Sequence, residues 1–408
     1  MNSPIAIYVH LPWCVSKCPY CDFNSHARPE ILPETQYVAA LLADLEADLD
    51  LAADRKVASV FLGGGTPSLF GVGAITSLIE GLAKRLPFMP GAEITMEANP
   101  GTVEHGRFAG YAAAGVNRVS LGAQSFDAAM LRALGRIHGP GEIEAAVAEL
   151  VGAGFDNFNL DLMYALPNQT REGALADLEA AIGLGPAHLS HYQLTLEPGT
   201  VFHRRPPVLP DDDLAFEMQL DCQARLAEAG FAQYEISAYA RPGRQCRHNL
   251  NYWRFGDYLG IGAGAHGKAT VDGAVIRTEK PRSPRAYLEG GGRQAATRRP
   301  VPASELPFEF MLNALRLSEG FTLDDFERET GLPAATVLPK LREDAARGLI
   351  AEQSGRFQAT GLGFRFLNDL MAGFLPEENA RRAPGELYTA PSRHVSDRDF
   401  RRFVSEVP

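Results

Sequence analysis

The stretch YVHLPWCVSKCPYCDF, residues Tyr8 to Phe23, decides how the rest of this chain is interpreted. It places Cys14, Cys18 and Cys21 in a CxxxCxxC spacing directly after a short β-like run. Structural zinc takes four ligands in a closed tetrahedron, and iron–sulfur clusters are usually held by four cysteines. Three thiolates on one loop are therefore an incomplete set, which suits a cubane cluster with one iron left open for a second cofactor.

A zinc site is the alternative for the same loop. His26 follows the third cysteine closely enough to complete a Cys3His set, and the three thiols could also be reduced and idle. The spacing by itself favours the cluster. The rest of the chain has to raise or lower that preference.

The bulk composition excludes several classes of protein. The net charge of −11 argues against a general affinity for nucleic acid or for an anionic membrane. Five cysteines, an odd number with three of them crowded together, do not form a disulfide framework. The N-terminus lacks the pattern of a signal peptide, and no run approaches the ~20 apolar residues of a membrane span. We expect a cytoplasmic protein without membrane insertion.

Predicted strands and helices alternate over the first 230 residues. Six such β/α units favour a parallel sheet with right-handed crossovers, either doubly wound or curled into a barrel. The predicted strands are Ile5–His10, Ala58–Leu62, Ala92–Ala98, Val116–Leu121, Asn157–Leu162 and His188–Leu194, and the predicted helices are Glu34–Ala53, Ala74–Leu86, Val103–Ala114, Asp127–Leu134, Gly141–Ala153 and Asp211–Ala229.

Unusual polar or glycine-rich residues recur at the ends of these strands. They are the cysteine loop, the GGGTP run at residues 63–67, Glu97, Gln124, Asp161 and Tyr192-Gln193. Each of these features by itself is also typical of a turn or a helix cap. In barrels, however, the functional residues lie at the C-terminal ends of the strands, so their recurrence on one rim favours a barrel with its site there.

The last 165 residues contain four further parts. The run RQCRHNLNYWRFGDYLGIGAGAHG, residues 244–267, combines a thiol, two histidines and several aromatic rings, as a binding surface would. Arg277 to Glu305 is basic and rich in proline and glycine, which predicts a solvated linker. Leu306 to Leu375 resembles a winged helix, but its seven basic and ten acidic residues do not suit DNA, so we expect a packing module. Residues 376–408 read as a mostly disordered tail.

Several motifs together resemble one family. YVHLPWCVSKCPYCDFNSH, GGGTP, LGAQSF, LDLMYALP and HNLNYW, followed by the winged-helix-like module, resemble the oxygen-independent coproporphyrinogen III oxidase family of the radical S-adenosylmethionine (SAM) superfamily, and within it the heme-chaperone branch. The resemblance covers about residues 5–375. It implies an α/β fold with a partial (β/α)6 radical SAM barrel in 1–240, an HNxxYW region with a basic linker in 241–304, and a C-terminal module in 305–375.

The resemblance also implies cofactors and the residues that hold them. A [4Fe-4S] cluster would be ligated by Cys14, Cys18 and Cys21, and its reduced form could cleave SAM to a 5′-deoxyadenosyl radical. The residues implied for SAM are Tyr8, Tyr20, Gly64, Gly65, Thr66, Glu97, Gln124, Arg136 and Asp161. The alternative to SAM binding is that these residues form hydrogen bonds between neighbouring loops.

HNLNYW is the motif that suggests heme. His248 or Cys246 would ligate the heme iron, and Tyr252 and Trp253 would offer flat apolar area to the macrocycle. The alternative is a loop whose polar groups bond the backbone, with Trp253 in the core. His266 has the same ambiguity, whereas Cys222, on a long predicted helix, is expected to be buried and inert.

Two departures separate this chain from the oxidases of the family. Oxidases carry a fourth cysteine two residues after the third, where this chain has Phe23, and they have an N-terminal extension, whereas only seven residues precede Tyr8. Both departures count against porphyrinogen oxidation. We therefore expect a heme chaperone that passes heme to acceptor proteins. It could form a homodimer. The alternative is a radical SAM enzyme such as coproporphyrinogen III dehydrogenase or a HemN-like methyltransferase.

Overall fold

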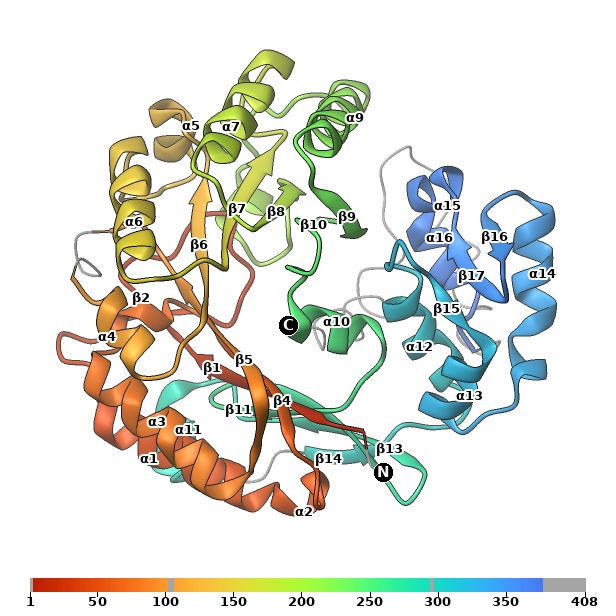
Figure 1. The fold of residues 1–408 in the computed structure, drawn as a ribbon, viewed down its shortest axis with the longest axis horizontal. Coiled ribbons are helices and arrows are strands. Elements are labelled where there is room, and N and C mark those ends of the chain that lie inside the picture. The colour runs from red at the N-terminus through yellow and green to blue at the C-terminus, as the bar shows by residue number, and fades with distance from the viewer. Residues whose placement is uncertain (1–2, 102–105, 294–296, 377–408) are drawn as a thin grey trace.

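The computed structural model describes residues 3–101, 106–293 and 297–376. Nearly all of the tail expected to be disordered, from residue 377 onward, lies outside these described residues. The described chain forms an α/β barrel-like body and a smaller C-terminal module beside it (Figure 1). Within the described residues, no helix is both long enough and apolar enough to cross a membrane.

Six parallel strands form the centre of a twelve-stranded curved sheet. In spatial order they are β1 (Ile5–Leu11), β4 (Val57–Gly64), β5 (Phe88–Ala98), β6 (Arg118–Gln124), β7 (Phe158–Tyr164) and β8 (His188–Gln193). Helical segments connect each of these strands to the next one. The sheet is strongly curved (Figure 1). The partial (β/α)6 barrel expected from the sequence is therefore confirmed.

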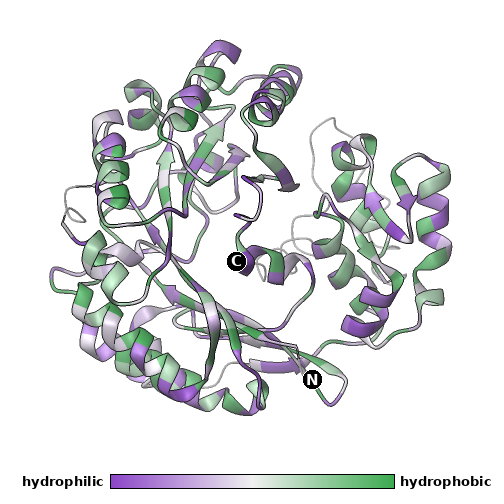
Figure 2. Ribbon diagram, in the orientation of Figure 1, coloured by the Kyte–Doolittle hydropathy of each residue, from purple (hydrophilic) through white to green (hydrophobic). Residues whose placement is uncertain are grey.

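Helices cover the outer face of this sheet (Figure 1). They are α1 (Glu34–Ala47), α2 (Leu49–Ala52), α3 (Val72–Arg85), α4 (Phe108–Ala113), α5 (Ala128–Ala133), α6 (Pro140–Gly152), α7 (Arg171–Gly183) and α9 (Asp212–Glu228), with the short η1 (Pro67–Leu69) and α8 (Val201–Arg204) at strand ends. Figure 2 shows hydrophobic and hydrophilic residues interspersed along them, as helices with one covered face require. Asp211 caps α9 by accepting a hydrogen bond from the Leu214 amide at 2.8 Å.

The sheet does not end at residue 240, and the basic stretch after residue 277 is not a solvated linker. β11 (Tyr258–Ile261) pairs in parallel with β1, and β12 (His266–Val271), β13 (Ala274–Glu279) and β14 (Thr297–Pro300) continue the sheet beyond it. The opposite edge carries β10 (Ala238–Ala240) and β9 (Ala232–Glu235). The expectation was wrong because Arg277 and Lys280 have buried acidic partners, Glu309 and Asp44, that their local sequence does not reveal.

Helix α10 (Arg247–Trp253) lies inside the curve of the sheet, whereas the other barrel helices lie outside it (Figure 1). The His248 ring stacks on Phe61 of β4, with ring centroids 5.1 Å apart, and lies 6.5 Å from the Tyr8 ring of β1. The HNLNYW motif is therefore packed against the inner surface of the barrel.

The C-terminal module has the winged-helix-like order predicted for it. It contains α12 (Leu306–Ala314), β15 (Phe321–Thr322), α13 (Leu323–Thr330), η2 (Ala334–Thr336), α14 (Leu338–Ala346), the hairpin β16 (Ile350–Gln353) and β17 (Arg356–Ala359), and finally α15 (Gly361–Arg365) and α16 (Leu367–Ala372). Its core is separate from that of the barrel but includes Phe255 and Val275 from the barrel side. The module is thus packed onto the barrel.

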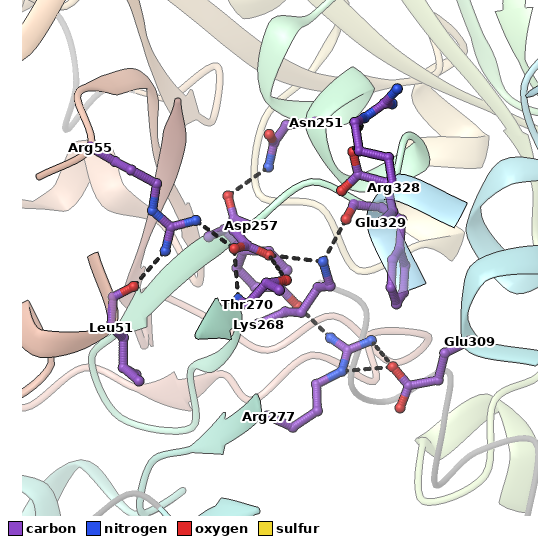
Figure 3. Close-up of polar contacts among 12 residues, drawn as sticks. Leu51, Arg55, Asn251, Asp257, Lys268, Thr270, Arg277, Glu309, Arg328 and Glu329 are labelled. Atoms are coloured by element: carbon purple, nitrogen blue, oxygen red, sulfur yellow. Dashed lines mark hydrogen bonds and ion pairs between the residues drawn. The ribbon is translucent and has the colours of Figure 1, made fainter. Parts of the chain in front are cut away.

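Buried charges hold the module against the barrel (Figure 3). Arg277 of β13 donates to Glu309 of α12 at 2.8 Å, and both side chains are almost fully buried. Beside this pair, Asp257 accepts from Lys268 at 2.8 Å and from Thr270, and also pairs with Arg55. Paired charges can be buried because each supplies the hydrogen bonds that water would otherwise give.

Candidate cofactor site at the strand ends

The cysteine loop is closed at its base by a short parallel pair of strands. β2 (Trp13–Cys14) pairs with β3 (His26–Ala27), and the Arg28 amide donates to the Cys14 carbonyl at 2.9 Å. The thiols of Cys14, Cys18 and Cys21 are half-buried, and all five cysteines of the chain are free thiols. The loop therefore presents three thiols at the C-terminal end of β1.

Two hydrogen-bond donors point at these thiols, one just after the end of β4 and one in the loop between α5 and α6. Thr66 Oγ1 donates to Cys14 Sγ at 3.5 Å, and Arg136 Nη1 donates to Cys18 Sγ at 3.6 Å. Asn99 joins the two donors, because its Nδ2 donates to Thr66 Oγ1 at 2.9 Å and its Oδ1 accepts from Arg136. Asn99 was not identified from the sequence, although its place directly after β5 is the signal that could have found it.

The GGGTP run packs against the start of the cysteine loop. The Gly65 amide donates to Leu11 O at 2.9 Å, and the Thr66 amide donates to Trp13 O at 2.8 Å. Gly64 has φ +106, and a Cβ added there would lie 2.4 Å from the His10 ring. Glycine is required at this position because a larger residue would displace His10. The run thus fixes the cysteine loop in addition to any contact with a ligand.

Two carboxyl groups face the same space from β5 and β7. Glu97 accepts from the Gly64 amide at 3.0 Å, and burial together with the negative charge of Asp161 raises its pKa to about 8. Burial also raises the pKa of Asp161, although Ser120 Oγ and Asn159 Nδ2 donate to it at 3.1 and 2.7 Å. Such raised values are typical of carboxyl groups placed to meet a cationic ligand or a proton.

Of the remaining residues expected around SAM, Tyr20 and Gln124 lie on the same rim. Burial raises the pKa of Tyr20, whose nearest charges are Arg136 and Cys18. Gln124, with φ +69, accepts from the Tyr192 hydroxyl at 2.8 Å. Tyr8 lies deeper, on β1, with its hydroxyl 3.0 Å from His10 Nδ1. The structure therefore brings the predicted residues other than Tyr8 to one end of the barrel; their contacts with SAM stay a prediction.

The donor set fits an iron–sulfur cluster better than a single zinc ion. Among the residues that the structure describes, no group of three or more His, Cys, Asp or Glu side chains is arranged to hold one metal ion. His26, the fourth ligand of the zinc alternative, has its Nε2 3.3 Å from Asn24 Oδ1. A cubane distributes its ligands over several irons, so its cysteines need not converge on a point. In addition, the buried Nε of Arg136 has no hydrogen-bond partner, which leaves a cationic donor for an anionic group.

His248 and Tyr252 of the HNLNYW motif are buried, whereas its other residues are half-buried. His248 is 1% exposed; its Nδ1 is 3.0 Å from Ser59 Oγ and its Nε2 is 3.0 Å from the Tyr252 hydroxyl. Burial lowers the pKa of His248 to about 3, so the ring is neutral. Arg316 of the C-terminal module lies over the Trp253 ring at 4.3 Å. Ligation of heme iron by His248 therefore requires one of its two hydrogen bonds to break.

Glu93, which the sequence did not single out, holds the start of α10 in place. The Glu93 carboxylate accepts from the backbone amides of Arg247 and His248 at 3.2 Å each, and from the Cys246 thiol at 3.5 Å. Burial raises the pKa of Cys246 to about 12, so this thiol is protonated. Arg118 is buried and lies near Cys246 and Glu93.

Two other residues were ambiguous in the sequence. Cys222 is fully buried on α9, as expected, and burial raises its pKa to about 12. His266 begins β12, apart from α10, and burial lowers its pKa to about 4. Neither residue joins the thiols of the cysteine loop.

Comparison with known proteins agrees with this geometry. Residues 8–181 match the radical SAM superfamily, and residues 301–366 match the HemN C-terminal domain. The chain is 52% identical to the heme chaperone HemW of Escherichia coli (strain K12), over 92% of this chain and 99% of that protein. It is 49% identical to HemW of Haemophilus influenzae, with the same coverage. The solved structure of coproporphyrinogen III oxidase (HemN) from Escherichia coli superimposes with a TM-score of 0.76 at 23% identity, over 91% of this chain and 90% of that one, and so shares the fold.

Proposed function

Because the chain belongs to the HemW family of heme chaperones within the radical SAM superfamily, we propose that it binds heme and transfers it to acceptor proteins, and that it carries a [4Fe-4S] cluster and SAM. The observation that carries the proposal is the meeting of three free thiols, two donors to their sulfurs and two carboxyl groups at one end of the barrel. A reducing cytoplasmic location suits these free thiols.

Cys14, Cys18 and Cys21 would ligate the cluster, with Thr66 and Arg136 donating to their sulfurs. A bound cluster with one open iron supplies a place for the amino and carboxylate groups of SAM and an electron for it. The amides of Gly64, Gly65 and Thr66 are already used within the protein, so this run would meet the amino group of SAM, which keeps N–H donors, through its carbonyl oxygens.

Heme would be bound through the HNLNYW helix. A neutral imidazole is the form that ligates iron, and His248 is held neutral by burial. Because its two nitrogens are hydrogen-bonded inside the barrel, we propose that α10 moves away from Ser59 before His248 meets heme. Tyr8, expected at the SAM site, lies next to His248, so one residue adjoins both proposed sites.

Heme titration of the anaerobically reconstituted protein, with and without SAM, tests this function. We expect a Soret band that is weakened in His248→Ala and unchanged in His203→Ala, a histidine on the surface. Wild-type-like affinity in both His248→Ala and Cys246→Ala would remove the proposed ligands. Absence of heme binding by the wild-type protein would overturn the function, and 5′-deoxyadenosine formed together with oxidation of coproporphyrinogen would support the enzyme instead.

A further inference from the structure

The cysteine loop has little secondary structure of its own between its closing strands. Residues 15–25 form neither helix nor strand. Their internal hydrogen bonds are local: Lys17 Nζ donates to Phe23 O and Ser25 O at 3.0 and 3.3 Å, and the Cys21 amide donates to Cys18 O at 3.2 Å. The Ser25 amide donates to Phe23 O at 2.6 Å, and Cys21 Sγ lies 3.8 Å from Ser25 Oγ. A ligand loop without regular structure has to be positioned by contacts from outside it.

Asn24 makes such outside contacts with its side-chain amide and its backbone carbonyl. Its side-chain Nδ2 donates to Ala263 O and to Arg282 O, both at 2.9 Å, and its Oδ1 lies 3.3 Å from His26 Nε2. Its backbone carbonyl accepts from His10 Nε2 at 3.0 Å. One residue thus joins the returning arm of the cysteine loop to β1 and to two segments about 240 and 260 residues later.

The segment that receives Asn24 is itself fixed. The Ala263 amide donates to the Tyr37 hydroxyl oxygen at 2.9 Å, and the Tyr37 hydroxyl donates in turn to His10 O at 3.0 Å. The neighbouring Gly262 amide donates to the buried Asp44 at 3.0 Å. These bonds hold the segment around Ala263 in place. They give a role to part of the GIGAGAHG run, which makes none of the proposed cofactor contacts.

Gly264 shows that the approach of Asn24 is close. Its φ is +80, and a Cβ added to it would lie 2.3 Å from Asn24 Nδ2. Any side chain at this position would push the amide away from Ala263 O. The glycine and the asparagine are therefore a matched pair.

We propose that Asn24 is the positioning residue of the cluster loop, and that its bonds to Ala263 and Arg282 determine where Cys21 stands relative to Cys14 and Cys18. This inference rests on the proposed function only in requiring that the three cysteines hold a cluster. Asn24 does not ligate iron; it acts through the loop. Loss of a residue that orients metal ligands typically weakens metal binding about 10–100-fold.

The test compares Asn24→Asp, Asn24→Ala and Gly264→Ala with a matched control. Asn24→Asp keeps the size of the side chain but removes both donors. The control is Asn117→Ala, because Asn117 also makes two side-chain bonds to backbone, with Ile94 N and Ala92 O at 2.8 Å, on β5 away from the loop. After anaerobic reconstitution, iron content, the electron paramagnetic resonance spectrum of the reduced cluster and the rate of iron release to a chelator are measured, with thermal unfolding of the iron-free proteins alongside.

We expect the Asn24 and Gly264 variants to release iron about 10–100-fold faster and to show an altered cluster spectrum, while Asn117→Ala matches wild type. Wild-type iron release and spectrum in Asn24→Asp would overturn the inference. So would a loss of iron in Asn117→Ala as large as in Asn24→Asp, since the effect would then be general destabilisation. A wild-type protein that takes up no cluster would overturn the proposed function instead, and that result is read from the wild-type sample alone.

Discussion

The carboxylate of Glu93, on β5, accepts a hydrogen bond from the backbone amide of His248, on α10, at 3.2 Å. Both residues are buried, and the bond places a negative charge at the start of a short helix, where the backbone amides have no partner within the helix. Because the same helix carries the proposed heme ligand, we expect Glu93 to oppose any movement of His248 out of the barrel.

Replacing Glu93 with glutamine should loosen α10. The amide keeps the shape but removes the charge that accepts from Arg247 and His248 and faces Arg118, so we expect a loss of about 1.5–3 kcal/mol in the free energy of unfolding. Hydrogen exchange of residues 247–253 and the association of heme should both become faster. Glu46→Gln, on the surface, is the control. Unchanged exchange in α10 would contradict the role given to Glu93.

Glu97 should make stability depend on pH. Its pKa of about 8 in the folded protein, against 4.5 in the unfolded chain, means that the folded state retains a proton which the unfolded state releases. The free energy of unfolding of the iron-free protein should therefore fall as the pH rises from about 4.5 to about 8. In Glu97→Gln this fall should be smaller by about 1–2 kcal/mol. The difference is modest because the Glu97 side chain is partly exposed, and water screens part of the effect of burial on its pKa. Parallel curves for the two proteins from pH 5 to 8.5 would contradict the prediction.

The barrel was predictable from sequence because its strands and turns are local features. The starts and ends of β4 and β6 differ by only a few residues from the predictions. Helix α7 was not predicted: its core-facing side includes the buried Asp177, which accepts from Ser125 at 2.8 Å and interrupts the apolar pattern. The linker interpretation failed for a related reason, since the partners of Arg277 and Lys280 lie far away in sequence.

The site was predictable where the residues follow strand ends in order, as Glu97 and Asp161 do. Asn99 and Asn24 were not identified, because an asparagine after a strand or in a loop is usually a turn residue. Their roles depend on partners from other strands and from a segment near residue 263. Three-dimensional proximity of that kind leaves no periodic signal in one sequence.

The three loop cysteines should be individually required for iron, whereas Cys222 should not. Replacing Cys14, Cys18 or Cys21 with serine removes a thiolate from a set that already leaves one iron open, so we expect loss of most of the iron, the sulfide and the broad visible absorbance. Cys222→Ala is the control, because that thiol is buried in the barrel core. Full iron content in any one of the three serine variants would exclude that residue as a ligand.

The ion pair that docks the C-terminal module should matter for stability more than an exposed pair does. Arg277→Met leaves the buried carboxylate of Glu309 without its guanidinium, and removal of one member of a buried pair costs about 3–5 kcal/mol. The exposed pair of Arg285 with Glu289 provides the control, since Arg285→Ala should cost less than about 1 kcal/mol. Chemical denaturation and limited proteolysis near residue 301 measure both effects, because an undocked module exposes its connection to β14.

The double variant Arg277→Met, Glu309→Met should recover part of the loss, since no unpaired charge remains buried. A double variant as unstable as Arg277→Met alone would show that packing, and not the unpaired charge, accounts for the loss.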